Sequence, residues 1–494
     1  MSRFILSNNL LLLRHAIYYS AGRVLTGIIG LISLSVLTHV LSPSDYGQYS
    51  VIVAVGLMIA GIGFQWLRQG LLRFKKKEIG VSSELLGTIG LLFFIVMFVV
   101  IAVAIIMRLI SERFKFNFSS LEIMVICSIS FSQAWFELAA DAARTELKPW
   151  RYSLATFLRS ILSLVFGVAA ALLWNNIPLV ILGVSLGYVI ASFFAAPKWL
   201  MGFFNISSST KNQAKSLLIY GIPLAGSFLM IFILDTVDRF MLASMQGYLE
   251  AGVYASSYNI AQFSIGTVLA GVGLGVLPIA VDSFRESDSA PTKKLLEYNL
   301  LIGIVICLPA TVGLAMVSPV LNSLLLGNYV SGKSEIITAV IAFAIGLATL
   351  RSSCVDVIFM LYRRSWMQVL IIGFAALANI LLNFFVIPRW GAVGAALSSL
   401  FAFAGAMVGS VWVSRSFMKI SIGLIEVIKV VISTAAMAGV VHFTLRIDGG
   451  WLGLILSIII GFSAYALLIL FTNVAECRVW LLGKFKAFYI DRLR

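Results

Sequence analysis

Apolar stretches of about twenty residues, separated by short polar segments, repeat along the whole chain. A helix rises about 1.5 Å per residue, so each stretch can cross about 30 Å of hydrocarbon. The pattern predicts an all-α polytopic membrane protein with about fourteen transmembrane helices. The predicted helices start near Ala16, Tyr46, Glu84, Leu121, Tyr152, Pro178, Ser216, Gly252, Lys293, Ser334, Trp366, Gly391, Gly423 and Trp451.

Composition excludes an ordinary soluble fold. Of the 494 residues, 60% are hydrophobic and 12% are charged, whereas soluble domains carry about 25% charged residues. The first apolar stretch is too long for a cleaved signal peptide, and we expect it to remain as a signal anchor. No loop exceeds about twenty residues, which leaves no room for a soluble catalytic domain. The four cysteines are far apart and suggest neither a disulfide framework nor a metal site. We expect no cofactor.

The formal charge of +15 is distributed unevenly between the two sides of the predicted membrane. With a cytoplasmic N-terminus, the cytoplasmic loops and termini hold about 26 of the 36 lysines and arginines, and the other side holds about six. This asymmetry places both termini in the cytoplasm. Basicity therefore indicates orientation and not a nucleic-acid partner. The basic, aromatic tail 474–494 fits either an interfacial helix or a solvated segment.

Two polar loops resemble each other at a constant offset. LSPSDYGQYS and GYLEAGVYASS align Asp45 with Glu250, Gly47 with Gly252 and Tyr49 with Tyr254. Six predicted helices separate the loops, so two copies would share one orientation, related by a pseudo-two-fold axis along the membrane normal. The predicted parts are a six-helix bundle at 1–202, a cytoplasmic linker at 203–216, a second six-helix bundle at 217–415, two additional helices at 416–473 and the tail 474–494.

The segment GNYVSGKS, from Gly327 to Ser334, fits the phosphate-loop pattern letter for letter. Such a loop works between a strand and a helix of a soluble α/β domain. Here it joins two predicted membrane helices on the side of the membrane without ATP. We interpret the match as a coincidence.

Three charges lie in the outer third of the seventh predicted helix, within ILDTVDRFML. They are Asp235, Asp238 and Arg239, and each costs about 2.5 to 3.5 kcal/mol at a helix centre. Asp235 and Arg239 are four residues apart and can pair on one face. The pattern fits either a neutralised anchor near the outer interface or the lining of a polar cavity.

Six further ionisable residues fall in the inner half of predicted helices. They are Arg23, Glu137, Asp141, Arg159, Arg351 and Asp356. Charges on four different helices indicate a polar cavity in the bundle interior. For the two aspartates, near cytoplasmic helix ends, we expect interface placement, and for the three arginines we expect the cavity.

Several motifs together resemble the polysaccharide flippases, also called Wzx-type O-antigen transporters, of the multidrug/oligosaccharidyl-lipid/polysaccharide exporter superfamily. The motifs are LSPSDYGQYS, YGIPLAG followed by DRFML, AGVYASSYNIA, LPATVGLAMVSPVLNSLLLGNY and NFFVIPRWGAVGAALSS. The resemblance covers nearly the whole chain. These flippases are bacterial inner-membrane transporters of lipid-linked oligosaccharide repeat units.

The resemblance implies transport of an undecaprenyl-diphosphate-linked oligosaccharide by alternating access, and not an enzymatic activity. Guanidinium groups suit a diphosphate because they hold two oxygens at once. We therefore expect Arg23, Arg159 and Arg351 to line a cavity that receives the headgroup. Asp235, Asp238 and Arg239 would form part of an outer gate, and Glu137, Asp141 or His442 would carry coupling protons, with sodium coupling or downhill exchange left open.

The expected partners are the lipid-linked substrate, membrane lipids and the polysaccharide polymerase machinery. Two other functions fit the sequence. One is a drug or lipid-precursor exporter of the same superfamily. The other is a membrane-embedded glycan polymerase or ligase, which would need a large external loop with catalytic groups.

Overall fold

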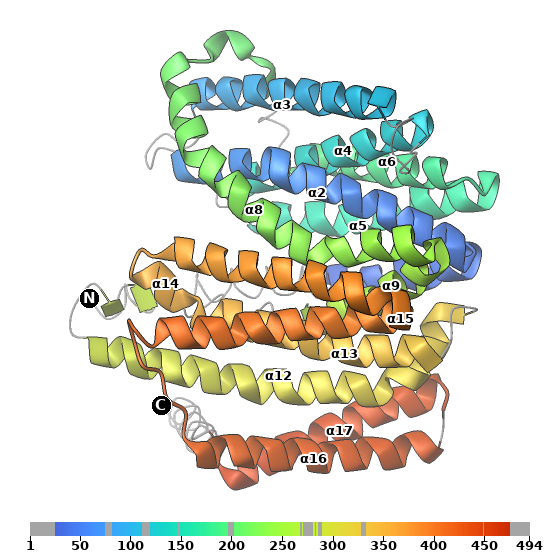
Figure 1. Ribbon diagram of the computed structural model, residues 1–494, viewed down its shortest axis with the longest axis vertical. Helices are drawn as coiled ribbons and strands as arrows, with labels where there is room; N and C mark the ends of the chain where they lie inside the picture. The colour runs from blue at the N-terminus through green and yellow to red at the C-terminus, as the bar shows by residue number, and fades with distance from the viewer. Residues whose placement is uncertain are drawn as a thin grey trace, which may run out of the picture. The chain divides into compact units, whose positions relative to one another are not determined.

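The computed structural model describes residues 25–74, 82–110, 119–145, 149–195, 202–266, 269, 280–281, 283–284, 289–327, 332–447 and 449–474. Within these residues, eleven helices are long and apolar enough to cross a membrane, and Leu25–Val40 is a shorter apolar helix. This confirms a helical multi-pass membrane protein (Figure 1). The count of fourteen stays a prediction.

Packing divides the chain into two units. Unit 1 comprises Met1–Ala255 and Ile380–Gly391, and unit 2 comprises Ser256–Asn379 and Ala392–Arg494. The long helix after the predicted linker packs against helices of unit 1. The two six-helix bundles and the axis between them stay predictions.

Unit 1 is built from long helices that pack side by side. They are α2 (Pro43–Phe74), α3 (Ser83–Ile110), α4 (Ser120–Thr145), α5 (Pro149–Trp174), α6 (Ile177–Ala195), the 3₁₀ helix η2 (Ile206–Ser208), α8 (Lys211–Gln246) and most of α9 (Tyr248–Ala261). The predicted starts near Glu84, Leu121, Tyr152 and Pro178 each lie within three residues of the start of a helix from α3 to α6.

Local sequence signals begin several of these helices. Pro43 and Pro149 occupy the first position of α2 and α5, where a missing N–H costs nothing. The Ser42 hydroxyl accepts from the Asp45 N–H at 3.2 Å and donates to the Asp45 carboxylate at 2.6 Å. Thr210 caps α8 by accepting from the Gln213 N–H. Since α8 starts at Lys211, residues 211–216 of the segment predicted as a linker belong to this helix.

Aromatic rings fill the core between α2, α3 and α4. The rings of Phe64 and Phe93 have centroids 4.7 Å apart, and those of Trp135 and Phe203 are 4.9 Å apart in an edge-to-face arrangement. The three phenylalanines belong to one buried apolar cluster, in which Phe64 and Phe203 are fully buried, and the partly buried Trp135 packs against it. Such rings stabilise helix contacts beyond the area they bury. This core holds α2 and α4 in fixed register.

Unit 2 contains the remaining helices. They are the π-helical turn η3 (Gln262–Gly266), α12 (Ser289–Leu326), α13 (Gly332–Leu350), the π-helical turn η5 (Arg351–Val355), α14 (Val357–Leu361), α15 (Ser365–Ser414), α16 (Leu424–Ile447) and α17 (Trp451–Thr472). Helix α12 packs against α13 and α16, and α16 packs against α17. The Tyr465 hydroxyl of α17 donates to the Val305 carbonyl of α12 at 2.7 Å.

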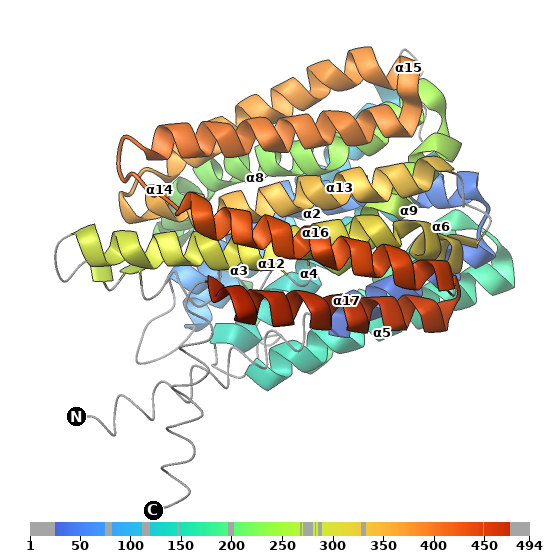
Figure 2. The same cartoon turned by 90° about the horizontal axis from the view of Figure 1, so that it is seen from below.

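Helix α15 folds back on itself. Its 50 residues are interrupted at Gly391, whose φ of +54° belongs to the left-handed region that favours glycine. Figure 2 shows the two limbs running antiparallel. Within unit 2, Asn379 of the first limb donates to Ser399 of the second at 3.4 Å. The start predicted near Gly391 thus coincides with the bend.

Candidate functional site

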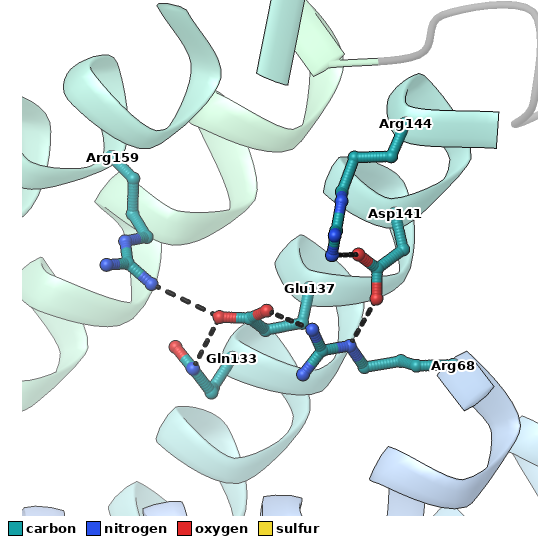
Figure 3. A network of polar contacts seen from close by, with 6 residues as sticks. All are labelled: Arg68, Gln133, Glu137, Asp141, Arg144 and Arg159. Atoms are coloured by element: carbon teal, nitrogen blue, oxygen red, sulfur yellow. Dashed lines mark hydrogen bonds and ion pairs between the residues drawn. The ribbon is translucent and has the colours of Figure 1, made fainter. Parts of the chain in front are cut away.

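A row of polar side chains follows one face of α4. Gln133, Glu137 and Asp141 recur every four residues, and Arg144 lies three residues further. Residues at this spacing share a helix face. The face is turned toward α2 and α5, each of which contributes an arginine (Figure 3).

Arg68 of α2 links the two carboxylates of this face. Its Nη2 lies 2.8 Å from Glu137 Oε2, and its Nε lies 2.8 Å from Asp141 Oδ2. A guanidinium group can do this because its donors diverge in one plane. Asp141, only 1% exposed, also accepts from Arg144 Nη1 at 3.1 Å. This burial within the protein differs from the interface placement that we expected for Asp141.

Arg159 of α5 reaches Glu137 from the other side. Its Nη1 lies 3.4 Å from Glu137 Oε1, which also accepts from Gln133 Nε2 at 3.1 Å. The guanidinium carbon of Arg159 lies 5.0 Å from the ring centroid of Phe136 and 5.3 Å from that of Tyr188. Both rings attract the cation through their faces. Arg159 is therefore held near Glu137 without a short ion pair.

Together these side chains form what we call the arginine cluster: Arg68, Gln133, Glu137, Asp141, Arg144 and Arg159. It combines three guanidinium groups with two carboxylates, which leaves one net positive charge. Arg68 and Arg159 are each 20% exposed and Glu137 is 21% exposed. Pairing stabilises these largely buried charges, and their partial exposure leaves them accessible to a charged ligand.

A cavity adjoins the cluster. Its volume is about 140 Å³, and Arg68, Gln133, Glu137 and Gln65 line it together with apolar groups that include Gly61 and Phe232. At about 30 Å³ per water molecule, the cavity has room for about four waters, with polar partners on one wall. The cluster therefore borders a space that water can fill.

The other predicted arginines lie elsewhere. Arg23 falls outside the described residues. Arg351 lies in unit 2, in the π-helical turn η5, where it is 5% exposed and its Nη1 is 3.5 Å from Asp356 Oδ2. Asp356 also accepts from the Ser410 hydroxyl at 2.8 Å and is 1% exposed, which again differs from the expected interface placement. The convergence of the three predicted arginines stays a prediction.

The predicted outer trio separates into different environments on α8. Asp238 is 2% exposed, whereas Asp235 is exposed and Arg239 is half-buried. The Asp238 carboxylate accepts from the Tyr254 hydroxyl at 2.5 Å and from Asn383 Nδ2 at 2.5 Å. Asp238 is thus a buried carboxylate that accepts hydrogen bonds from two side chains, and the predicted pairing of Asp235 with Arg239 stays a prediction.

The two repeated loops meet at the N-terminal ends of α2 and α9. A Cβ built on Gly47 would lie 1.8 Å from the Tyr248 carbonyl oxygen, and one built on Gly252 would lie 2.2 Å from the Pro43 carbonyl oxygen. Such distances leave no space for a methyl group. Beside them, Gln48 of α2 donates to Glu122 of α4 at 2.7 Å. The glycines let the two helix ends close against each other.

Sequence reasoning missed Arg68, which it counted among the basic residues of a cytoplasmic loop. One signal was available. The buried residues Phe64, Leu67 and Leu71 continue the apolar pattern of α2 past Arg68, so this arginine belongs to the helix and not to the loop that follows it.

The sequence of this chain matches the model of a known protein family. The family model described as "Polysaccharide biosynthesis protein" matches residues 12–284. No curated protein sequence matches the chain.

Solved structures of transporters share the fold. The lipid II flippase MurJ in an inward closed conformation superposes with a TM-score of 0.71 at 14% identity, covering 93% of this chain and 99% of that one. An inward-facing multidrug resistance MATE family transporter superposes with a TM-score of 0.56 at 14% identity, covering 81% of this chain and 94% of that one. A MOP superfamily transporter from Pyrococcus furiosus superposes with a TM-score of 0.51 at 14% identity, covering 81% of this chain and 95% of that one. The fold is that of the MurJ and MATE transporters.

Proposed function

Because this chain belongs to the polysaccharide biosynthesis protein family, we propose that it carries undecaprenyl-diphosphate-linked oligosaccharide repeat units across the bacterial inner membrane. The direction is from the cytoplasmic to the periplasmic leaflet, for O-antigen or another surface polysaccharide. Moving an unshielded diphosphate through hydrocarbon would cost tens of kcal/mol. A hydrated path with fixed cations removes most of that barrier.

The observation that supports this proposal most directly is the arginine cluster beside its cavity. To bind a diphosphate, an arginine of the cluster must break its ion pair with a carboxylate. This is favourable only if that carboxylate keeps other hydrogen-bond partners. Arg159 meets this condition because its 3.4 Å contact with Glu137 is the longest ion pair of the cluster. When Arg159 moves to a phosphate, Glu137 still has its ion pair with Arg68 at 2.8 Å and its hydrogen bond from Gln133 at 3.1 Å. Breaking the contact between Arg159 and Glu137 therefore costs little free energy, because no buried carboxylate is left unpaired.

The remaining candidates take the following roles in this proposal. Arg23 supplies a further cation from the first predicted helix. Arg351 stabilises unit 2 through its pair with Asp356, because a guanidinium that is 5% exposed offers little to a ligand. Glu137 and Asp141 couple protons to transport, since protonation of Glu137 would weaken its hold on Arg159. Asp238, with Asp235 and Arg239 near it, belongs to the outer gate or binds the coupling ion.

Alternating access requires the outer end to close while the headgroup binds. The close approach of Gly47 to Tyr248 and of Gly252 to Pro43 supplies a closed contact between helix ends. Opening these ends in the outward state would release the glycan, and rocking of one half against the other is the motion expected of transporters built from repeats.

The proposal is tested with proteoliposomes that contain an undecaprenyl diphosphate bearing a short fluorescent glycan. A membrane-impermeant reagent that modifies the glycan measures how fast inner-leaflet headgroups reach the outside. We expect protein-dependent translocation of this lipid and none of a lipophilic cationic drug. Transport of the drug alone would favour the exporter function and contradict the proposal.

A further inference from the structure

The two limbs of α15 enclose an apolar groove within unit 2. Its volume is about 530 Å³, and its lining comes from residues 366–378 of the first limb and 401–413 of the second. Small residues such as Ala375, Ala402 and Gly405 are among the lining residues. A Cβ built on Gly405 meets nothing within 4 Å, so the space beside Gly405 is open to an occupant.

Large exposed rings also line the groove. Phe374 is 70% exposed, Phe401 65% and Trp412 73%. The lining spans thirteen residues on each limb, from Trp366 to Ala378 and from Phe401 to Val413, and the twelve steps between the first and the last cover about 18 Å at 1.5 Å per residue. The hydrocarbon of one leaflet is about 15 Å thick, half of the 30 Å core. The groove is therefore as long as a single acyl chain in one leaflet.

One end of the groove is basic. At Trp412 and Val413 it continues into a second hollow of about 450 Å³, which Arg415 and Ser416 also line. Three more exposed basic residues, Arg363, Arg364 and Lys419, lie within three residues of a lining residue. In the part of the chain that the structure describes, no ion pair joins these four side chains to a carboxylate. Their charge is available to an external anion.

We propose that this groove is a binding site for an anionic phospholipid, with one acyl chain between the limbs of α15 and the phosphate beside Arg415. An apolar groove one leaflet deep with cations at the headgroup end complements such a lipid in both length and charge. Basic pockets between transmembrane helices are general sites for anionic headgroups. The occupant is a membrane lipid and not the transported substrate, whose longer polyprenyl chain would exceed the groove.

The site is tested by native mass spectrometry of the full chain in detergent, with phosphatidylglycerol or phosphatidylcholine of the same acyl chains as probes. We expect preferential retention of phosphatidylglycerol. Arg415→Ala should weaken it about fivefold, the effect of one basic residue near an anionic headgroup. Gly405→Leu, which fills the groove, should weaken both lipids by about tenfold or more.

Two matched variants control for general effects. Arg446→Ala removes another exposed basic residue, and Gly439→Leu adds the same side chain to α16, where a Cβ also meets nothing within 4 Å. Both should bind lipid as the unmodified protein does. Equal retention of the two lipids, unchanged binding by Gly405→Leu, or displacement of phosphatidylglycerol by undecaprenyl phosphate in a Gly405-dependent way would each overturn the proposal. Because the readout is binding, its outcome is independent of transport activity.

Discussion

Gly47 and Gly252, which occupy equivalent positions in the two repeated loops, lie in direct backbone contact. A Cβ on Gly252 would lie 3.2 Å from the Cα of Gly47, and one on Gly47 would lie 3.0 Å from the Gly252 nitrogen. The sequence repeat thus marks a place where two helix ends meet. In the proposed cycle this contact is the closed outer gate.

A methyl group at this contact should prevent closure. Gly47→Ala places a Cβ 1.8 Å from a backbone carbonyl oxygen, which has no rotamer to move away. We expect transport in proteoliposomes to fall about tenfold or more, the effect of about 1.4 kcal/mol or more on the closed state. Gly226→Ala in α8, where a Cβ meets nothing within 4 Å, is the control. A monodisperse Gly47→Ala protein with normal transport would show that this contact does not need to close.

Arg68 should contribute strongly to stability because it pairs with two carboxylates. Arg68→Ala leaves Asp141, 1% exposed, with Arg144 alone. We expect the free energy of unfolding to fall by about 3 kcal/mol. Arg73→Ala on the same helix, where the exposed guanidinium stacks on Tyr220, should cost less than about 1 kcal/mol. Denaturant unfolding in detergent measures both, and equal costs would contradict the assignment of Arg68 to the cluster core.

Asp238 should matter for coupling and not for the integrity of the protein. Asp238→Asn keeps the side-chain shape between Tyr254 and Asn383 but removes the charge. We expect transport to lose its dependence on an imposed proton or sodium gradient. The exposed Asp235→Asn change is the control and should leave that dependence intact. A gradient response that persists in Asp238→Asn would exclude this carboxylate from coupling.

Arg351 and Asp356 should behave as an internal pair. Arg351→Met alone leaves a buried carboxylate and should destabilise the protein by about 3 to 5 kcal/mol, whereas adding Asp356→Leu should recover most of that loss. The double variant should transport nearly as well as the unmodified protein. A stable double variant without transport would instead support the role in the cavity that the sequence suggests for Arg351.

Helices and their order follow from the sequence because apolar length and period are local properties. The starts of α3 to α6 and the bend at Gly391 were predictable for this reason. The partners of Arg68 were not, since Glu137 and Asp141 are 69 and 73 residues away and only packing brings them together. Arg68 lies near the cytoplasmic end of a predicted helix, where a basic residue fits the charge asymmetry of the loops as well as it fits a place in the helix.

Burial of charges was the least predictable property of the site. Depth along a helix suggested that Asp141 and Asp356 reach the interface, but depth does not say which way a side chain faces. Both turn inward and find arginine partners. The sequence predicts Arg159 as a charge inside a membrane helix, but its contacts with the rings of Phe136 on α4 and Tyr188 on α6 depend on how the helices pack.

The most direct test of the arginine cluster compares Arg159→Ala with Arg151→Ala in the proteoliposome assay for the undecaprenyl-diphosphate glycan. Both changes remove one arginine of α5, but Arg151 stacks on Trp150 and has no part in the cluster. We predict that Arg159→Ala lowers the initial rate about tenfold or more, as expected for the loss of a charge-assisted contact to phosphate, and that Arg151→Ala keeps it. Equal, undiminished rates for two well-folded variants would contradict the role of the cluster in handling the diphosphate.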